Sequence, residues 1–215
     1  MYSYIKGTLE ERDDLTITVE NGGIGYLINM PFALSSELGH LGSEVKVYVY
    51  QSVKEDDISL FGFNTRDSKD MFLRLITVNG VGPKVAHSIC SQLSPEKFAM
   101  AVISGNVASL TQVKGLGKKG AERIIVDLKD KMKEESISER GRSVAVVEDP
   151  SSSVDYTVSS EADMSVIRDA EDALVMLGYK PETAVEAVAH SYEDGIVLED
   201  LIKKSLKAAS GGKFA

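Results

Sequence analysis

Residues 75–86 (LITVNGVGPKVA) and residues 110–121 (LTQVKGLGKKGA) are two copies of one pattern, Leu-x-x-Val-x-Gly-h-Gly-x-Lys-x-Ala, where h is apolar. The offset between the copies is 35 residues throughout. Each copy lies between two stretches that carry apolar residues at helical spacing. Two helices joined by a Gly-h-Gly turn form a helix-hairpin-helix motif, so the repeat predicts a tandem of these motifs.

The residue types of the Gly-h-Gly turn suit it to binding a phosphate group. Gly80 can adopt a positive φ and end a helix, and Val81 is expected to point inward and anchor the hairpin. Gly82 allows a ligand to approach the backbone closely, and the helix that starts there leaves its first N–H groups unpaired. Such a helix N-terminus is a natural phosphate site. The residues in register in the second copy are Gly115, Leu116 and Gly117.

Basic residues follow both turns. Lys84 and the pair Lys118-Lys119 lie in the first turn of a helix, where lysine is unfavourable unless an anion offsets it. Arg123 follows Lys119 by one helical turn and can reach the same DNA strand. Contacts of this kind fix position along a DNA backbone and read no bases.

Three other interpretations were weighed. A single Gly-h-Gly turn is as typical of a plain helix connector as of DNA binding, and two in-register copies with lysines favour DNA. Residues 115–120 (GLGKKG) match the dinucleotide pattern G-x-G-x-x-G, but no strand precedes them and no βαβ unit surrounds them. Gly120 is followed by Ala121 and Glu122, so a Walker A phosphate loop is excluded there.

The chain outside the repeat predicts a multidomain protein, β first and then α. Residues 1–63 contain five short β-type runs with turn signals and a small helical insert at 31–38, which predicts an OB-type barrel. The expected strands are 5–11, 15–20, 24–30, 45–51 and 58–63. Residues 64–133 form the tandem hairpin domain, with helices expected at 67–77, 84–92, 95–105, 107–112 and 118–133.

The C-terminal third divides in the same way. Residues 134–162 are rich in Ser, Glu and Asp, which predicts a flexible acidic linker. Residues 163–208 predict a small bundle of three helices at 166–177, 181–192 and 197–208, and the tail at 209–215 is expected to be disordered.

Composition narrows the functional class. The net charge is −9, yet residues 64–133 hold 12 basic and 6 acidic side chains while residues 1–63 hold 4 and 10. A localised basic segment suits phosphate binding within an acidic protein. The chain has no apolar run long enough for a membrane span, no secretory signal and one cysteine, Cys90, so a cytoplasmic protein without disulfides is expected. Its three histidines lack ligand spacing, and we expect no metal and no cofactor.

This order of domains resembles the RuvA family of Holliday-junction-binding subunits. The stretches that carry the resemblance are Leu60–Phe63 (LFGF), Asn79–Lys84 (NGVGPK), Gly115–Lys119 (GLGKK) with Ala121–Arg123 (AER), and Leu177–Pro181 (LGYKP). The resemblance covers nearly the whole chain. One departure is Gly120, where the family's second hairpin usually carries a hydroxyl residue.

The resemblance implies a homotetramer, or two stacked tetramers, that holds a four-way DNA junction open and planar on one face. Each subunit would grip DNA backbones across the minor groove with its two hairpins. The candidate DNA-binding residues are Gly80, Val81, Gly82, Lys84, Gly115, Gly117, Lys118, Lys119 and Arg123.

The same resemblance assigns a role to an acidic turn. On residue types alone, Glu55, Asp56 and Asp57 indicate a solvated hairpin tip. The resemblance implies that Glu55 and Asp56 form an acidic pin, which repels phosphates at the crossover by like charge and performs no acid–base catalysis.

Partners are implied as well. The C-terminal bundle, described as UBA-like, would dock on the hexameric ATPase RuvB, and the resolvase RuvC is a further expected partner. The candidate RuvB contacts are Leu174, Leu177, Tyr179 and Leu206, for which a role in the bundle core is nearly as good an interpretation. The implied function is non-catalytic: the subunit presents the junction to RuvB, whose ATPase drives branch migration in recombination and repair.

Two alternatives remain at this point. A helix-hairpin-helix DNA glycosylase or lyase needs a catalytic carboxylate, for which Asp127 and Asp130 are the candidates, although they alternate with lysines as on a solvated face. A general single-strand-binding OB protein needs basic and aromatic residues on the barrel, and residues 1–63 are net acidic.

Overall fold

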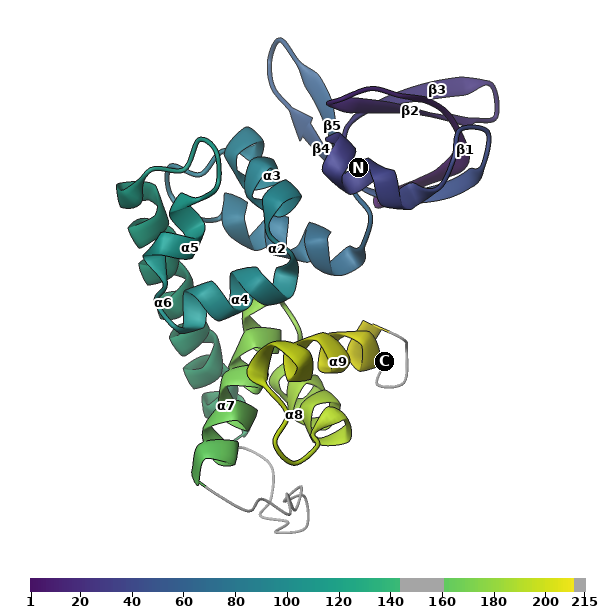
Figure 1. The fold of residues 1–215 in the computed structure, drawn as a ribbon. Coiled ribbons are helices and arrows are strands. Elements are labelled where there is room, and N and C mark those ends of the chain that lie inside the picture. The colour runs from purple at the N-terminus through teal and green to yellow at the C-terminus, as the bar shows by residue number, and fades with distance from the viewer. Residues whose placement is uncertain (144–160, 211–215) are drawn as a thin grey trace. The chain divides into compact units, whose positions relative to one another are not determined.

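The computed structural model describes residues 1–143 and 161–210, with side chains described for 1–131 and 163–210. These residues form two compact units (Figure 1). The first unit comprises Met1–Ser94 and Val113–Gly115, and the second comprises Pro95–Gln112 and the chain from Leu116 onward. Within the described residues, no helix combines the length and the apolar character that a membrane span needs.

The first unit begins with a closed five-stranded barrel of strand order β1-β2-β3-β5-β4 (Figure 1). All neighbouring strands are antiparallel except β3 and β5, and β1 closes the barrel by pairing with β4. A short helix and a 3₁₀ turn join β3 to β4, so the OB-type prediction is confirmed. The elements are β1 (Tyr4–Arg12), β2 (Thr16–Asn21), β3 (Ile24–Asn29), α1 (Phe32–Ser35), η1 (Ser36–Leu38), β4 (Glu44–Val53) and β5 (Ile58–Phe63).

The barrel core follows from alternation along the strands. In β4, Val45, Val47 and Val49 are buried while the residues between them are not, which places one face of the strand inward. Gly7 is required by close packing, because a Cβ there would lie 2.0 Å from the carbonyl oxygen of Glu20. The buried core residues are Ile5, Leu9, Ile17, Val19, Ile28, Met30, Leu34, Val45, Val47 and Val49.

Two helices of the tandem domain pack on the barrel within the same unit. They are α2 (Arg66–Ile76), whose first turn is capped by the Thr65 hydroxyl accepting from the Ser68 N–H, and α3 (Pro83–Gln92). Phe72 of α2 packs against Phe63 and Tyr50 of the barrel with its ring tilted to both, and the ring centroids are 5.0 and 4.9 Å away. This aromatic cluster ties the first hairpin to the barrel.

His87 of α3 lies inside that cluster. Its Nε2 donates to the carbonyl oxygen of Gly62 at 3.0 Å, and its ring meets Phe61 and Phe63 edge-on. Burial lowers the pKa of His87, and the hydrogen bond to Gly62 opposes that effect in part. The imidazole is therefore a neutral bridge between α3 and strand β5.

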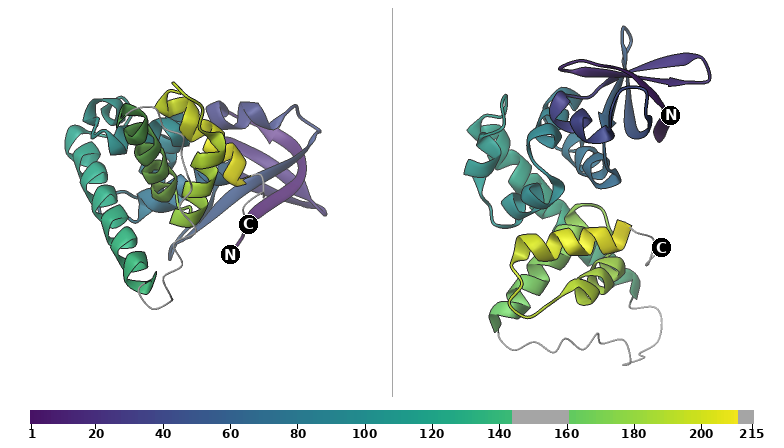
Figure 2. Two further views of the ribbon diagram at one scale, coloured as in Figure 1. Left: turned by 90° about the horizontal axis from the view of Figure 1, so that it is seen from below. Right: turned by 45° about the vertical axis from the view of Figure 1, so that its right-hand side comes forward.

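In its described residues, the second unit contains helices and no strands (Figure 2). Its elements are α4 (Pro95–Ile103), α5 (Val107–Thr111), α6 (Lys118–Ser143), α7 (Glu161–Met176), α8 (Pro181–Ser191) and α9 (Leu198–Ser210). The last three pack on one another as the predicted bundle. Small residues let them approach closely, because Ala170, Ala173, Ala184 and Ala187 are all fully buried between the helices.

The linker prediction needs one correction. The helix α6 continues to Ser143, well into the segment 134–162 that was expected to be flexible. Residues 134–143 are mostly Glu, Ser and Arg, and Glu and Arg are good helix formers, so an established helix can extend through them without a hydrophobic face. Residues 144–160 lie outside the described residues. The predicted tail at 209–215 overlaps the end of α9, and residues 211–215 also lie outside the described part.

The His87 bridge makes the stability of the first unit pH-dependent. Because burial lowers the folded-state pKa of His87, the unfolded chain binds its proton first as the pH falls. The stabilisation is therefore complete above the unfolded pKa of about 6.5 and is lost as the pH falls below it. Replacing His87 by Leu should cost about 1 kcal/mol at pH 8, because the Gly62 carbonyl loses its donor.

Urea unfolding at pH 8, 7, 6 and 5 checks this expectation. The His87→Leu variant should lose less stability between pH 7 and 5 than the wild type, and the exposed His40→Gln variant should follow the wild type. Parallel pH curves for wild type and His87→Leu would contradict the assignment.

Candidate nucleic-acid interface

The first hairpin has the predicted turn. Gly80 has a φ of 83°, and the N–H of Val81 donates to the Val78 carbonyl at 3.0 Å. The Val81 side chain is buried, so it anchors the turn as expected. Gly82 is the N-cap of α3 in an extended conformation and offers no side chain to cap the helix. Pro83 at the start of α3 has no N–H, and the amides that follow it in the first turn have no acceptor within the helix, so they are open to an external acceptor.

The second hairpin repeats this geometry. Gly115 has a φ of 92° and Leu116 is buried like Val81. The N–H of Ala121 donates to the Gly117 carbonyl at 3.0 Å, as that of Ala86 does to Gly82 in the first copy. Both copies therefore form the same turn followed by a helix N-terminus, which confirms the repeat in three dimensions.

The two glycines of each turn serve different purposes. Gly80 and Gly115 have positive φ, so the backbone itself requires glycine. Gly82 and Gly117 do not, and no described atom lies within 4 Å of a Cβ built on either. Their own packing gives no reason for glycine, whereas close approach of a ligand to the backbone would.

The charges at these helix ends are unusual for the chain. Acidic residues occupy the first turn of α2, α4, α8 and α9, as the helix dipole favours. Among the described first turns, those of α1, α3, α5 and α6 hold no acidic residue, and of these four only α3 and α6 carry lysine. Lys84, Lys118 and Lys119 are exposed, and Lys118 has a partner only in Glu122 of its own helix at 3.8 Å. An anion at either helix end would offset this unfavourable arrangement.

The structure brings the predicted DNA-binding residues together as two turns. The first turn contains Gly80, Val81, Gly82 and Lys84, and the second contains Gly115, Gly117, Lys118, Lys119 and Arg123. Arg123 is exposed one helical turn further along α6. Gly120 lies in the first turn of α6, where a Cβ would meet the Leu116 side chain at 3.0 Å. The glycine thus leaves room for the buried anchor of the hairpin.

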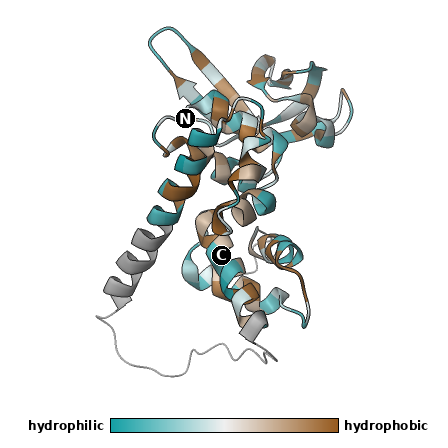
Figure 3. Cartoon of the chain, turned by 60° about the vertical axis from the view of Figure 1, so that its left-hand side comes forward, coloured by the Kyte–Doolittle hydropathy of each residue, from teal (hydrophilic) through white to brown (hydrophobic). Residues whose placement is uncertain are grey.

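The predicted pin residues lie at the tip of the β4–β5 hairpin, which Figure 3 shows as hydrophilic. Glu55 and Asp56 are exposed. Asp57 closes the turn, because its carbonyl accepts from the Lys54 N–H at 2.8 Å and its carboxylate accepts from the Ser59 hydroxyl at 2.6 Å. Asp57 therefore has a structural role in the tip, and the two residues before it are the ones presented outward.

An apolar pair beside the tip was missed by the sequence analysis. Val53 and Ile58 face each other across β4 and β5, and both are about two-thirds exposed (65% and 68%). In the sequence Ile58 reads as an ordinary strand residue, and Val53 lies beyond the expected strand 45–51. Their exposure depends on the hairpin projecting beyond the barrel core.

The candidate partner residues of the bundle are mostly covered. Leu174, Leu177 and Leu206 are buried, whereas Tyr179 is half-buried next to Gly178, which has a φ of 105°. The burial of these leucines fits the alternative interpretation, in which they belong to the core of the bundle. Their assignment as partner contacts stays a prediction.

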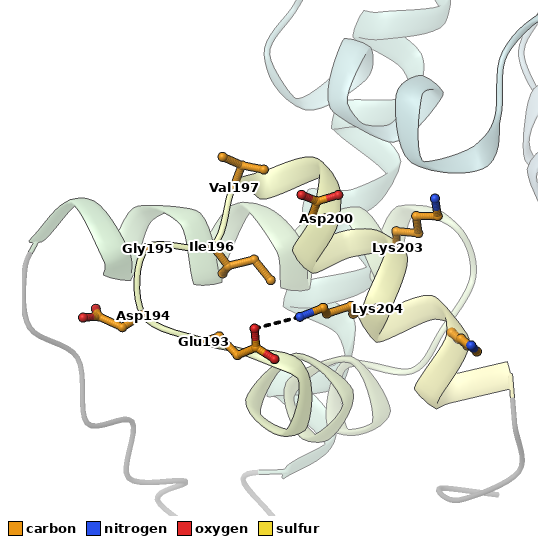
Figure 4. A pocket seen from close by; sticks show the side chains of 9 residues that line it. Glu193, Asp194, Gly195, Ile196, Val197, Asp200, Lys203 and Lys204 are labelled. Atoms are coloured by element: carbon orange, nitrogen blue, oxygen red, sulfur yellow. Dashed lines mark ion pairs between the residues drawn. The ribbon is translucent and has the colours of Figure 1, made fainter.

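A surface hollow in the bundle was not foreseen. It is lined by the loop between α8 and α9 on one side and by the lysines of α9 on the other (Figure 4). Glu193 and Lys204 point toward each other across it and form an ion pair of 2.8 Å. Val197 at its edge is 61% exposed. Acidic and basic groups balance one another there, so the hollow has no clear preference for an anion.

Comparisons with known proteins agree with this geometry. Three family models match the chain: RuvA N terminal domain over residues 1–62, SAM-like helix-hairpin-helix tandem over residues 72–130, and RuvA, C-terminal domain over residues 165–210.

Curated relatives match over almost the full length. A protein of Acetivibrio thermocellus is 42% identical over 207 residues, covering 96% of this chain and 98% of the relative. Proteins of Ruminiclostridium cellulolyticum and Geobacter sulfurreducens are 41% and 36% identical, covering 97% and 96% of this chain and 100% and 98% of the relatives. All three are named Holliday junction branch migration complex subunit RuvA.

The geometry of Gly82 and Gly117 predicts that substitutions there weaken DNA binding and leave the stability of the fold nearly unchanged. Gly82→Ala and Gly117→Ala should fold with stabilities within about 0.5 kcal/mol of wild type, because space is open and φ is compatible. Their affinity for DNA should fall about tenfold or more, since the added methyl group blocks charge-assisted hydrogen bonds to phosphate.

Thermal unfolding and DNA titration of each variant measure the two effects. Gly80→Ala is the matched control: its φ of 83° makes the substitution costly, by about 1–2 kcal/mol. Wild-type DNA affinity in both Gly82→Ala and Gly117→Ala would contradict the interface.

Proposed function

The chain belongs to the RuvA family, and from this premise we propose that it binds four-way (Holliday) DNA junctions, holds them open and planar, and presents them to the ATPase RuvB for branch migration in recombination and repair. The subunit itself carries out no chemistry in this scheme. Its work is to position the junction while RuvB supplies the energy of ATP hydrolysis.

The observation that carries the proposal is the pair of uncompensated helix ends. Each hairpin offers open backbone amides, a glycine without a packing reason and lysines where the rest of the chain places acids. A DNA phosphate supplies the missing acceptor and the missing negative charge. Contacts limited to the backbone suit a protein that must hold junctions of any sequence while base pairs are exchanged.

We assign the grip to the two turns residue by residue. Backbone N–H groups at the starts of α3 and α6, apart from Pro83, which has none, would donate to phosphate oxygens. Val81 and Leu116 would keep the turns rigid. Lys84, Lys118, Lys119 and Arg123 would add long-range attraction and direct phosphate contacts. This division of roles follows from the burial of the apolar anchors and the exposure of the cations.

A homotetramer with fourfold symmetry, alone or as two stacked tetramers, is part of the proposal. Support comes from large apolar side chains that the barrel leaves exposed. Leu15 and Phe32 are 69% and 56% exposed on adjacent turns, and Ile24 and Leu27 of β3 are 58% and 64% exposed. Exposed apolar surface of this kind typically marks a protein contact. In a fourfold assembly each subunit would contribute one pair of hairpins to the junction.

The acidic tip then has a mechanical role. Glu55 and Asp56 from each of four subunits would meet near the junction centre and repel phosphates at the crossover. Strands kept apart in this way are free to pair with new partners as RuvB moves the arms. The exposed tip and the use of Asp57 within the turn support this reading for the first two residues of the cluster.

Docking to the RuvB hexamer is assigned to the C-terminal bundle, within a domain division of 1–63, 64–133, 134–162 and 163–208. Tyr179 is the candidate contact at the surface, and Leu174, Leu177 and Leu206 would support it from the core. RuvC is proposed as a further partner at the same junction. The glycosylase alternative has little support: Asp127 is half-buried and Asp130 exposed, both on a helix rich in lysine.

The lysine pair of the second hairpin provides a direct test. Lys118→Ala combined with Lys119→Ala should weaken binding to all junction sequences by the same factor, because phosphate contacts carry no sequence information. The dependence of affinity on salt should also become less steep. Filter binding to three immobile junctions of unrelated sequence measures both effects.

Lys203→Ala with Lys204→Ala removes an equal charge from the bundle and is the matched control. Unchanged junction binding by the Lys118→Ala, Lys119→Ala double variant would refute the proposal.

The pin is tested by removing its charge without changing its shape. Glu55→Gln with Asp56→Asn should keep junction affinity and change the rate of branch migration with RuvB, or the preference for junctions over linear duplex. Asp13→Asn with Asp14→Asn removes the same charge from the β1–β2 turn and should behave as wild type. Wild-type rate and selectivity in the pin variant would return Glu55 and Asp56 to the status of a solvated tip.

A further inference from the structure

Helix α3 of the first hairpin holds the residue that opens the second. The Ser88 hydroxyl donates to the backbone carbonyl of Lys114 at 3.2 Å, and the Lys114 N–H donates to Oε1 of Gln92 at 3.2 Å. Both polar backbone groups of Lys114 are therefore bound by side chains. All three residues belong to the first compact unit.

We call the hydrogen bonds that Ser88 and Gln92 make to the Lys114 backbone the Gln92 clamp, and further bonds between these two side chains support it. Nε2 of Gln92 donates to both the carbonyl and the hydroxyl of Ser88, each at 3.0 Å. These two bonds fix the orientation of the amide, because only Oε1 then remains to accept from Lys114. Ser88 and Gln92 thus act as one unit in which each bond supports the others.

The position of Lys114 gives the clamp a purpose. Val113 before it is buried, and Gly115 after it has a φ of 92°, so the clamped backbone lies at the start of the second turn. The Lys114 side chain is exposed. The bonds use only its backbone, so they would accept almost any residue except proline and do not explain why lysine is there.

The internal repeat shows what lysine adds. Lys114 aligns at the offset of 35 with Asn79, which is uncharged. Around its turn the second hairpin therefore has Lys114, Lys118 and Lys119, where the first has Lys84. A cation at the start of the turn and two at the start of the helix would lie on either side of the glycines that a phosphate approaches.

We propose that Lys114 is an additional phosphate-binding residue of the second hairpin, and that Ser88 and Gln92 are positioning residues that hold it at the turn. The ligand is the DNA backbone, so this inference rests on the proposed function. Ordering the backbone of Lys114 before binding reduces the entropy that its contact with DNA must overcome.

Lys114→Ala tests the contact. Between 50 and 200 mM salt, each lost phosphate contact should reduce the salt-induced loss of junction affinity by about threefold, and affinity at low salt should fall. Lys180→Ala, an exposed lysine at the start of α8, is the matched control and should keep the wild-type salt dependence. A wild-type salt dependence in Lys114→Ala would overturn the proposal.

Measuring Lys118→Ala with Lys119→Ala in the same assay distinguishes two failures. Weak binding by that double variant together with wild-type binding by Lys114→Ala refutes the role of Lys114 and leaves the proposed function standing. Wild-type binding by both refutes the proposed function as well.

Gln92→Ala tests the positioning. It removes the acceptor of the Lys114 N–H, so amide hydrogen exchange at Lys114 should become faster and the salt dependence should shift toward that of Lys114→Ala. The matched control is Ser104→Ala, whose hydroxyl donates to the Met100 carbonyl at 2.6 Å and is not part of the clamp. A variant that lowers the melting temperature but keeps the wild-type salt dependence would show a purely structural clamp and overturn the positioning role.

Discussion

The proposed function depends on two helix ends, those of α3 and α6, whose positive charge no acidic residue of the first turn offsets. A helix N-terminus carries about half a positive elementary charge, and acids in the first turn normally stabilise it. The helices α3 and α6 begin with lysine instead, next to glycines that leave their backbone open. In water this arrangement lowers the stability of each helix only slightly, and a DNA phosphate bound at the helix end would remove that loss. The electrostatics of each helix end are thus unfavourable in the free protein and would be favourable in the DNA complex.

The rest of the fold keeps these ends in place. Val81 and Leu116 are buried beneath the turns, and the aromatic cluster around Phe72 and His87 joins the first hairpin to a rigid barrel. The Gln92 clamp fixes the backbone at the start of the second. Negative charge lies elsewhere, mainly on the barrel and in the segment after residue 133, and under the proposed function it would repel DNA from all but the basic region.

Local determinants explain what could be predicted from the sequence. Positive φ at Gly80 and Gly115 and the inward orientation of Val81 and Leu116 are each specified by a few neighbouring residues, and all were predicted correctly. Contacts between residues that are distant in the sequence were not predicted. The Gln92–Lys114 bond joins residues 22 positions apart and depends on how α3 packs.

The features that the sequence left open or missed have the same cause. Leu174, Leu177 and Leu206 could be core or surface residues on the sequence alone, because their burial depends on how closely small residues let three helices approach, which periodicity does not report. The extension of α6 to Ser143 reflects helix propensity without an apolar face, so a hydrophobic pattern gives no sign of it. The exposure of Val53 and Ile58 depends on the projection of the hairpin beyond the core.

The central claim is that the protein recognises the architecture of a four-way junction through its phosphates. A competition titration of the full chain at two salt concentrations tests it most directly, with an immobile junction, a linear duplex of the same sequence and a single strand as ligands. The account predicts strong preference for the junction at both salt concentrations, with affinity that falls steeply as salt rises. Equal affinity for junction and duplex would contradict it and would reduce the hairpins to general phosphate clamps.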